Sequence, residues 1–210
     1  MTEILNNEEL KEYLKPTYFI DSDNEIVIKK AESIVKDLDD TIKKASAIFY
    51  WTRDKIKYEP YESFTSRKIN YKASKVIKAG KGWCVQKACV LAALARAVKI
   101  PSRLHFADII NHQVSEKLKD IMGTNLFVFH GYTELYLNNK WIKATPAFNI
   151  ELCEKFGLKP VEFDGINDSI LPEYTLNGEK HIEYVRDRGT FSDFPFDLMF
   201  KTMRQYYKFV

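Results

Sequence analysis

Cys84 is the residue of this sequence best suited to covalent chemistry. It follows the run Gly-Lys-Gly-Trp and opens the helical stretch CVQKACVLAALARAV. A helix N-terminus presents unpaired N–H groups and a partial positive charge, which favour a nucleophilic thiolate and can also hold a developing oxyanion. Free cysteines are also common in packed cores. The position predicts a nucleophile with a pKa well below the ordinary thiol value of about 8.5.

A β-hairpin in the second half of the chain carries the residues that could assist this thiol. In NLFVFHGYTELYLNNKWIKATPAF, residues 125–148, Asn138–Asn139 predict a tight turn, because Asn tolerates the left-handed conformation. Folding at this turn gives an apolar pair on one face and an ion pair on the other, so the register is self-consistent. This register pairs Leu135 with Ile142, Tyr136 with Trp141, and Glu134 with Lys143.

His130 is the histidine that this register places near a possible partner. It falls opposite Ala147 and diagonal to Thr145 on the same face, and diagonal neighbours lie about 7–8 Å apart. We therefore expect His130 to take the proton of Cys84 while the side chain at position 145 orients the ring. A histidine on a strand is also often a hydrogen-bonded structural residue. The sequence offers no local partner for the other three histidines, His105, His112 and His181.

The elements that must position these residues are helical in the first half of the chain. Residues 21–60 predict two helices with a break near Asp37–Asp40. The second helix has a mostly apolar stripe at helical spacing: Ile42, Ala45, Phe49, Thr52 and Ile56. The stretch SKVIKAG predicts a short helix with Ser74 as its N-cap and Gly80 just past its end.

The predicted secondary structure changes from helices to mostly strands after the helix that begins at Cys84. Pro101 ends this helix, because proline disfavours helix in the residue before it. Residues 102–110 then predict a strand, residues 111–123 a short helix, and the hairpin follows. Residues 150–210 hold turn signals and a helix near the C-terminus. A chain in which helices come first and antiparallel strands follow is typical of an α+β fold, which we therefore predict.

Composition limits the class of protein. The 210 residues suffice for one domain with a buried core, and they are 45% hydrophobic and 29% charged. The net charge is only +3 with basic residues spread along the chain, which argues against a nucleic-acid partner. No window approaches the ~18 apolar residues of a membrane span, and the acidic N-terminal stretch lacks signal-peptide features. We expect a cytoplasmic protein without a membrane partner.

The cysteines give no sign of a metal site. Cys84, Cys89 and Cys153 are odd in number and form no CxxC pair, so neither a disulfide framework nor a structural zinc site is predicted. Cys89 lies roughly 140° around the helix from Cys84 and is predicted to be core. We expect no metal and no cofactor.

Three segments together resemble the transglutaminase-like superfamily in order and spacing: AIFYWTRDKIKYEP, ASKVIKAGKGWCVQKACVLAALARAVKIPSRL and HGYTELYLNNKWIKATPAF. The resemblance covers residues from about 46 to 149. It implies a papain-like core in which N-terminal helices, including the nucleophile helix, pack on an antiparallel sheet carrying His and then Asp. Cys84 matches the nucleophile and His130 the general base. Residues 1–210 would form a single domain, with residues 150–210 as an extension that wraps the core.

The third catalytic position departs from the family pattern. Relatives carry Asp after the second strand of the hairpin, whereas WIKATP places Thr145 there. Thr145 can accept a hydrogen bond from the imidazole but has no charge to stabilise imidazolium. A carboxylate of the later segment is an alternative orienting group: first Asp164, then Asp168, Asp187 and Asp193. The resemblance also implies a side chain that assists the oxyanion hole, for which Trp51 and Tyr58 are the candidates.

These residues predict a cysteine-dependent acyl-transfer enzyme with a peptide or protein substrate. Cys84 attacks an amide carbonyl, and His130 accepts the thiol proton and returns it to the leaving amine. Hydrolysis is favoured over amine-acceptor cross-linking, because the chain shows no calcium-type acidic loop of the kind that large animal transglutaminases carry. The alternative is a non-catalytic binding or scaffold domain that kept the fold and lost the third catalytic residue.

Overall fold

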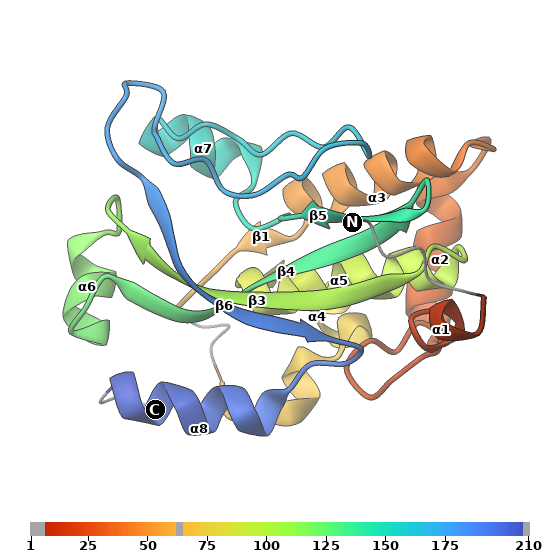
Figure 1. The fold of residues 1–210 in the computed structure, drawn as a ribbon, viewed down its shortest axis with the longest axis horizontal. Coiled ribbons are helices and arrows are strands. Elements are labelled where there is room, and N and C mark those ends of the chain that lie inside the picture. The colour runs from red at the N-terminus through yellow and green to blue at the C-terminus, as the bar shows by residue number, and fades with distance from the viewer. Residues whose placement is uncertain (1–6, 62–64, 208–210) are drawn as a thin grey trace.

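A computed structural model describes residues 7–61 and 65–207, which form one main antiparallel sheet against a group of helices (Figure 1). The helices are α1 (Asn7–Glu12), α2 (Glu25–Val35), α3 (Thr41–Lys55), η1 (Lys68–Tyr71, a 3₁₀ helix), α4 (Ala73–Ala79), α5 (Cys84–Ala97), α6 (Glu116–Met122), α7 (Ile150–Phe156) and α8 (Phe196–Tyr206). The strands are β1 (Lys57–Tyr58), β2 (Lys81–Gly82), β3 (Ser102–Asn111), β4 (Leu126–Leu137), β5 (Lys140–Ala144) and β6 (Ile182–Phe191). The expected α+β fold is confirmed.

Two capped helices form the first part of the helical layer. Asn24 caps α2 and Asp40 caps α3, each by accepting a backbone N–H of the first turn. The chain breaks between them at Asp37, whose φ of 63° is left-handed. The two helices expected within residues 21–60 are confirmed, and four of the five positions of the apolar stripe are buried.

The short helix α4 differs from the prediction at its start. Its N-cap is Lys72, and Ser74 lies inside the first turn, so the prediction of Ser74 as N-cap is wrong. The reason is tertiary: the Asp21 carboxylate accepts hydrogen bonds from both the N–H and the hydroxyl of Ser74. A side chain from a distant part of the chain thus satisfies this helix end. Gly80 closes the helix with a φ of 66°, as expected.

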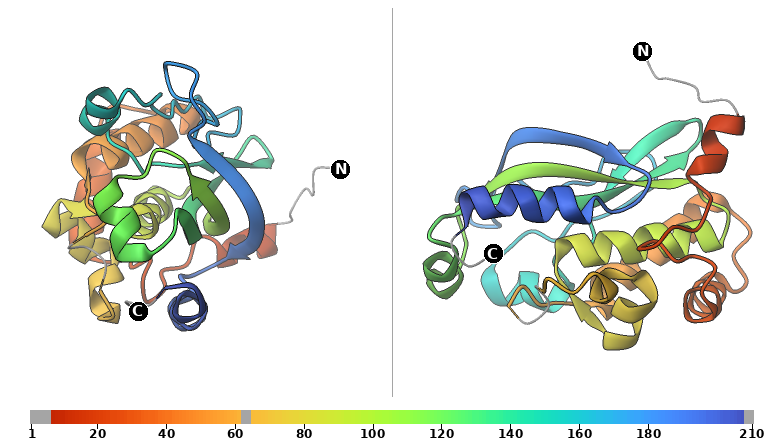
Figure 2. Two further views of the ribbon diagram at one scale, coloured as in Figure 1. Left: turned by 90° about the vertical axis from the view of Figure 1, so that its left-hand side faces the viewer. Right: turned by 90° about the horizontal axis from the view of Figure 1, so that it is seen from below.

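Helix α5 lies at the centre of the molecule. Figure 2 shows it between the sheet and the helices α2, α3 and α4, and its residues from Cys84 to Arg96 are buried. Its alanines let β4 approach closely, and the Thr133 hydroxyl donates to the carbonyl oxygen of Ala88 at 2.9 Å. Because every face of α5 is packed, its first residue, Cys84, is held in a defined place.

The sheet has the strand order β5-β4-β3-β6, and all its neighbours are antiparallel. The expected hairpin turn is confirmed, since Asn138 and Asn139 have φ values of 49° and 62°. The expected register is confirmed for the five pairs from Thr133–Ala144 to Leu137–Lys140. The expected ion pair between Glu134 and Lys143 is replaced, because Glu134 binds Arg103 and His105 of β3 instead.

Strand β6 is an element that the sequence analysis did not predict. It pairs with β3 at the edge of the sheet with two register shifts, and Gly189 has a left-handed φ of 84°. The stretch RDRGTF resembles a turn because this edge strand is irregular and half-exposed. The helix expected near the C-terminus is confirmed as α8.

Candidate active site

Cys84 is a buried thiol at the first position of α5. The backbone N–H groups of Gly131, of Val85 and of Cys84 itself act on its sulfur and lower the pKa of the thiol. Burial is the larger effect and raises the pKa of Cys84 to about 11. The expectation of a lowered pKa is therefore wrong for the resting site, and Cys84 carries its proton at pH 7.

Gly131 makes the contact between α5 and β4 possible. A Cβ atom at Gly131 would lie 3.1 Å from the Cα of Val85 and 3.0 Å from the Cε1 of Phe106. Any side chain here would push the start of α5 away from the strand and remove the N–H of residue 131 from the Cys84 sulfur. The sequence analysis did not single out Gly131, although a glycine inside a strand is a known signal of close backbone approach.

A β-bulge in β4 sets the orientation of the His130 side chain. Between the pairs Ile109–Phe127 and Ala107–His130, β4 has one residue more than β3. Phe129 takes up this extra length with a left-handed φ of 58°, and its N–H donates to Asp108 Oδ1 at 3.0 Å. Bulges re-orient the side chains next to them and recur beside active sites. The expected position of His130 opposite Ala147 is wrong, because β5 ends at Ala144 and Pro146 has no N–H to donate.

Cys84 and His130 line one cleft of about 310 Å³. The His130 side chain is 4% exposed, and its Nε2 atom has no hydrogen-bond partner among the described residues. Burial lowers the pKa of His130 to about 3, so the imidazole is neutral at pH 7. A neutral imidazole can accept a proton, which is what a general base requires.

Thr145 lies directly after β5 and is fully buried. Its N–H donates to the carbonyl oxygen of Ser169 at 2.9 Å. Its hydroxyl lies beside the phenol of Tyr184 and makes no hydrogen bond of normal geometry to the part of the chain that the structure describes. The Tyr184 ring in turn lies 6.2 Å from the His130 ring, centroid to centroid. Tyr184, which the sequence analysis did not single out, therefore lies between position 145 and the histidine.

The four candidate carboxylates form hydrogen bonds with groups outside the cleft. Asp164 lies in an exposed loop, where the N–H groups of Asn167 and Ile166 lower its pKa to about 2. The other three accept hydrogen bonds from different partners: Asp168 from the Lys143 N–H, Asp187 from His105, and Asp193 from the Phe19 N–H. None of these four carboxylates is among the described residues that line the cleft.

The two oxyanion candidates are placed differently. Tyr58 lines the cleft, and burial raises the pKa of its phenol, with a further rise from the nearby Cys84 sulfur. Trp51 lies on α3 with the ammonium of Lys30 5.2 Å from its ring centroid, and it is not among the described residues that line the cleft.

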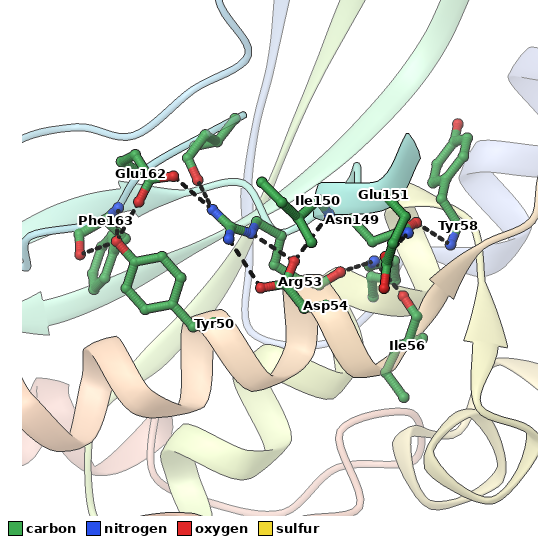
Figure 3. A network of polar contacts seen from close by, with 12 residues as sticks. Tyr50, Arg53, Asp54, Ile56, Tyr58, Asn149, Ile150, Glu151, Glu162 and Phe163 are labelled. Carbon is green, nitrogen blue, oxygen red and sulfur yellow. Dashed lines mark hydrogen bonds and ion pairs between the residues drawn. The ribbon is translucent and has the colours of Figure 1, made fainter. Parts of the chain in front are cut away.

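A polar network behind the cleft holds Tyr58 in place (Figure 3). The Tyr58 N–H donates to Asn149 Oδ1 at 3.1 Å. The buried Lys87 of α5 donates from its Nζ to the carbonyl oxygens of Arg53 and Ile56, at the end of α3. Burial lowers the pKa of Lys87 to about 7. These contacts join α3, α5 and the start of α7 to strand β1, which carries Tyr58 to the cleft.

The described residues were compared with the requirements of a metal site and of a membrane-spanning helix. Within residues 7–61 and 65–207, no group of three or more His, Cys, Asp and Glu side chains is arranged to hold a metal ion. Over the same residues, no helix has the length and apolar character that crossing a membrane requires.

Comparison with known proteins decides the family. The family model of the transglutaminase-like superfamily matches residues 28–146, more than half of the chain. The chain belongs to the transglutaminase-like superfamily. The family match contains both Cys84 and His130, together with Thr145 at the position after β5. A search of curated proteins finds no significant match to the sequence.

A solved structure shares the fold of this superfamily member. The structure described as a "Putative Cysteine Protease from Cytophaga hutchinsonii" has a TM-score of 0.57 and 19% identity, and covers 90% of this chain. This chain spans 48% of the length of that protein. The periplasmic domain of TgpA from Pseudomonas aeruginosa has a TM-score of 0.46 and 13% identity over 68% of this chain and 48% of its own. At 19% identity, the first likeness concerns the fold alone.

Proposed function

We propose that this protein is a cysteine-dependent acyl-transfer enzyme that hydrolyses a peptide or amide bond. The observation that carries the proposal is that Cys84, at a helix start where the Gly131 N–H acts on its sulfur, shares one cleft with the neutral base His130. Membership of the transglutaminase-like superfamily and the fold shared with a protein described as a putative cysteine protease support the same class of chemistry.

The reaction starts from two neutral groups. As the Cys84 sulfur attacks the amide carbonyl, its proton moves to His130, and the carbonyl oxygen becomes an oxyanion. The Cys84 N–H and the Tyr58 phenol are the donors we assign to that oxyanion. The C–N bond then breaks, His130 gives its proton to the leaving amine, and a Cys84 thioester remains. Water attacks the thioester with His130 as base, which releases the acid and restores the thiol.

Thr145 takes the place of the usual carboxylate in this proposal. Its free hydroxyl accepts the N–H of His130 Nε2 in the reacting complex and so selects one tautomer of the ring. Without a negative charge it stabilises imidazolium less than Asp does. None of the acidic residues Asp164, Asp168, Asp187 and Asp193 has this role in the proposal.

The rival proposal is a binding domain of the same fold without catalysis. It is favoured by two observations: Thr145 has no charge, and burial disfavours the thiolate form of Cys84 and the imidazolium form of His130. A third option keeps the thioester but passes the acyl group to an amine rather than to water. We place the protein in the cytoplasm, where a reducing environment preserves the thiol; cell fractionation tests this location.

Trapping the thioester separates these proposals. The protein is incubated with a mixture of acyl-amino-acid coumarin amides, and the reaction is quenched in acid. The mass of the peptide that contains Cys84 is then measured by mass spectrometry. We expect an acyl adduct on Cys84 that hydroxylamine removes and that Cys84→Ala does not form. In His130→Ala the rate of adduct formation should fall at least about 100-fold. Cys89→Ala is the matched control and should keep the adduct. No adduct, or one independent of His130, would support the binding domain.

The acceptor is identified from the product of the same incubation. With methylamine added, hydrolysis yields the free acid, whereas an amine acceptor yields the N-methylamide. We expect the free acid to dominate.

A further inference from the structure

The cleft beside Cys84 has two chemically different walls. Cys84 and His130, from α5 and β4, carry its reactive atoms, and Tyr58 lies beside them. Helices α6 and α8 supply an apolar wall, made of Leu118, Ile121, Met122 and Met203. Phe127 and Val128 connect the two walls, and none of the described residues that line the cleft carries a formal charge.

The phenols of the cleft add little hydrogen-bonding capacity to the apolar wall. The Tyr207 hydroxyl donates to the carbonyl oxygen of Leu126 at 2.9 Å and accepts the N–H of Val128 at 2.7 Å. The Tyr61 hydroxyl is bonded to Ser115 Oγ at 3.0 Å. An ammonium, carboxylate or amide group placed against α6 and α8 would lose its water without gaining equivalent partners.

From these contacts we infer that the wall formed by α6 and α8 binds an uncharged, apolar side chain of the substrate, next to the amide that Cys84 attacks. The inference rests on the proposed function for the identity of that amide. The volume of about 310 Å³ suits a single large side chain together with the reacting amide rather than a folded partner. Ile121, 47% exposed, and Tyr61, 40% exposed, stand where the side chain would enter.

Methionine methyl groups report binding without any need for catalysis. Met122 and Met203 line the cleft, whereas Met199 of α8 is fully buried and is not among the described lining residues. Full-length Cys84→Ala labelled with ¹³C at the methionine methyls is titrated with N-acetyl-phenylalanine amide, N-acetyl-glutamine amide and Nα-acetyl-lysine amide. We expect the phenylalanine derivative to shift the Met122 and Met203 signals, to leave Met199 unmoved, and to bind at least about tenfold more tightly than the other two.

A charge placed on the apolar wall should reverse this preference. Ile121→Glu puts a carboxylate at the mouth of the cleft at a half-exposed position that tolerates it. We expect this variant to bind Nα-acetyl-lysine amide more tightly than N-acetyl-phenylalanine amide. Leu198→Glu is the matched control, because Leu198 is an apolar helix residue of 48% exposure that lies outside the described cleft lining. It should keep the wild-type order.

The two proposals fail in different ways. Equal affinity for the three derivatives, or shifts confined to Met199, would overturn the apolar side-chain site even if the Cys84 thioester forms. A phenylalanine preference at Met122 and Met203 with no thioester would uphold the site as a binding cleft and overturn only the catalytic proposal.

Discussion

Burial governs the chemistry of single residues in this site. It raises the pKa of Cys84 to about 11 and lowers the pKa of His130 to about 3, so it favours the neutral form of each group. The N–H groups of Gly131 and Val85 act in the opposite direction on the thiol but do not outweigh burial. In the proposed reaction, proton transfer therefore accompanies the attack on the substrate, because both groups are neutral before it.

Alkylation of Cys84 tests this resting state. Iodoacetamide should react about tenfold faster per pH unit from pH 7 to pH 10, because the thiolate is the reactive form. His130→Ala should leave this slope unchanged, since His130 is neutral over that range. The rate is read by mass spectrometry of the Cys84 peptide, with the fully buried Cys89 as the internal control. A plateau below pH 7 that His130→Ala removes would instead show a thiolate–imidazolium pair.

Restoring a carboxylate at position 145 should strengthen the base. If Thr145 orients the imidazole as proposed, the new charge in Thr145→Asp should raise the pKa of His130 and speed Cys84 acylation by about tenfold or more. Position 145 is fully buried, so the variant should also lose about 1–3 kcal/mol of unfolding free energy. Single-turnover acylation against pH and urea unfolding measure the two effects. Thr145→Asn has the same shape without the charge, and an identical pH profile in both variants would refute the prediction.

At the scale of elements, the site depends on how closely α5 approaches β4. Gly131→Ala places a Cβ 3.1 Å from the backbone of Val85, so α5 must shift. We expect a loss of about 1–3 kcal/mol of unfolding free energy, together with a loss of Cys84 acylation. Gly178→Ala is the control, because nothing lies within 4 Å of its added Cβ and only its φ of 81° is strained. Equal acylation in the two variants would show that the contact is not needed.

The link between α3 and α5 should depend on pH through Lys87. Its folded pKa of about 7 lies below its unfolded value of about 10.4. Between these values the unfolded state binds more protons, so the contribution of Lys87 to stability rises with pH, by up to about 1.4 kcal/mol per pH unit. Urea unfolding of wild type and Lys87→Met from pH 6.5 to 9.5 isolates this contribution. A constant difference between the two proteins would contradict a neutral buried amine.

At the scale of the whole molecule, His105 ties three strands of the sheet together. Its Nδ1 atom lies 2.6 Å from Glu134 of β4, and its Nε2 atom lies 3.0 Å from Asp187 of β6. Burial alone would lower the pKa of His105, but the two carboxylates outweigh it and the pKa is raised. β6 follows the 157–181 segment, so this histidine helps to hold the C-terminal part of the chain on the sheet.

The sign of the resulting pH dependence follows from the raised pKa. The stabilisation is complete below the unfolded value of about 6.5 and is lost as the pH rises through the folded value. The melting temperature of wild type minus that of His105→Phe should therefore shrink from pH 5.5 to pH 8.5. His181 is the control of opposite sign: burial lowers its pKa to about 4, so the difference for His181→Phe should grow between pH 4 and pH 6.5. A pH-independent difference at His105 would exclude a charged cross-strand link.

Local patterns in the sequence determined most of the elements and led to the proposal of Cys84 and His130 as the reactive pair. The start of α5 at Cys84 and the register of the Asn138–Asn139 hairpin depend on neighbouring residues alone, and both are as expected. Strand β6 was not predictable in this way, because an irregular edge strand exists through backbone pairing with β3 rather than through its own side-chain pattern. The contact of the Asp21 side chain with the start of α4 was also not predictable from local patterns, since Asp21 lies 53 residues from Ser74 along the chain.

The sequence by itself determined where α5 starts and how the Asn138–Asn139 hairpin pairs, and from these it proposed Cys84, His130 and Thr145 as one site, because helix propensity, turn chemistry and family spacing act along the chain. Tertiary structure alone decided the state of that site. Only packing shows that Gly131 lets α5 touch β4, that Phe129 bulges to aim His130, and that Tyr184 reaches position 145. Only packing removes the water around Cys84 and His130, and pKa values depend on that desolvation, which no local sequence pattern encodes.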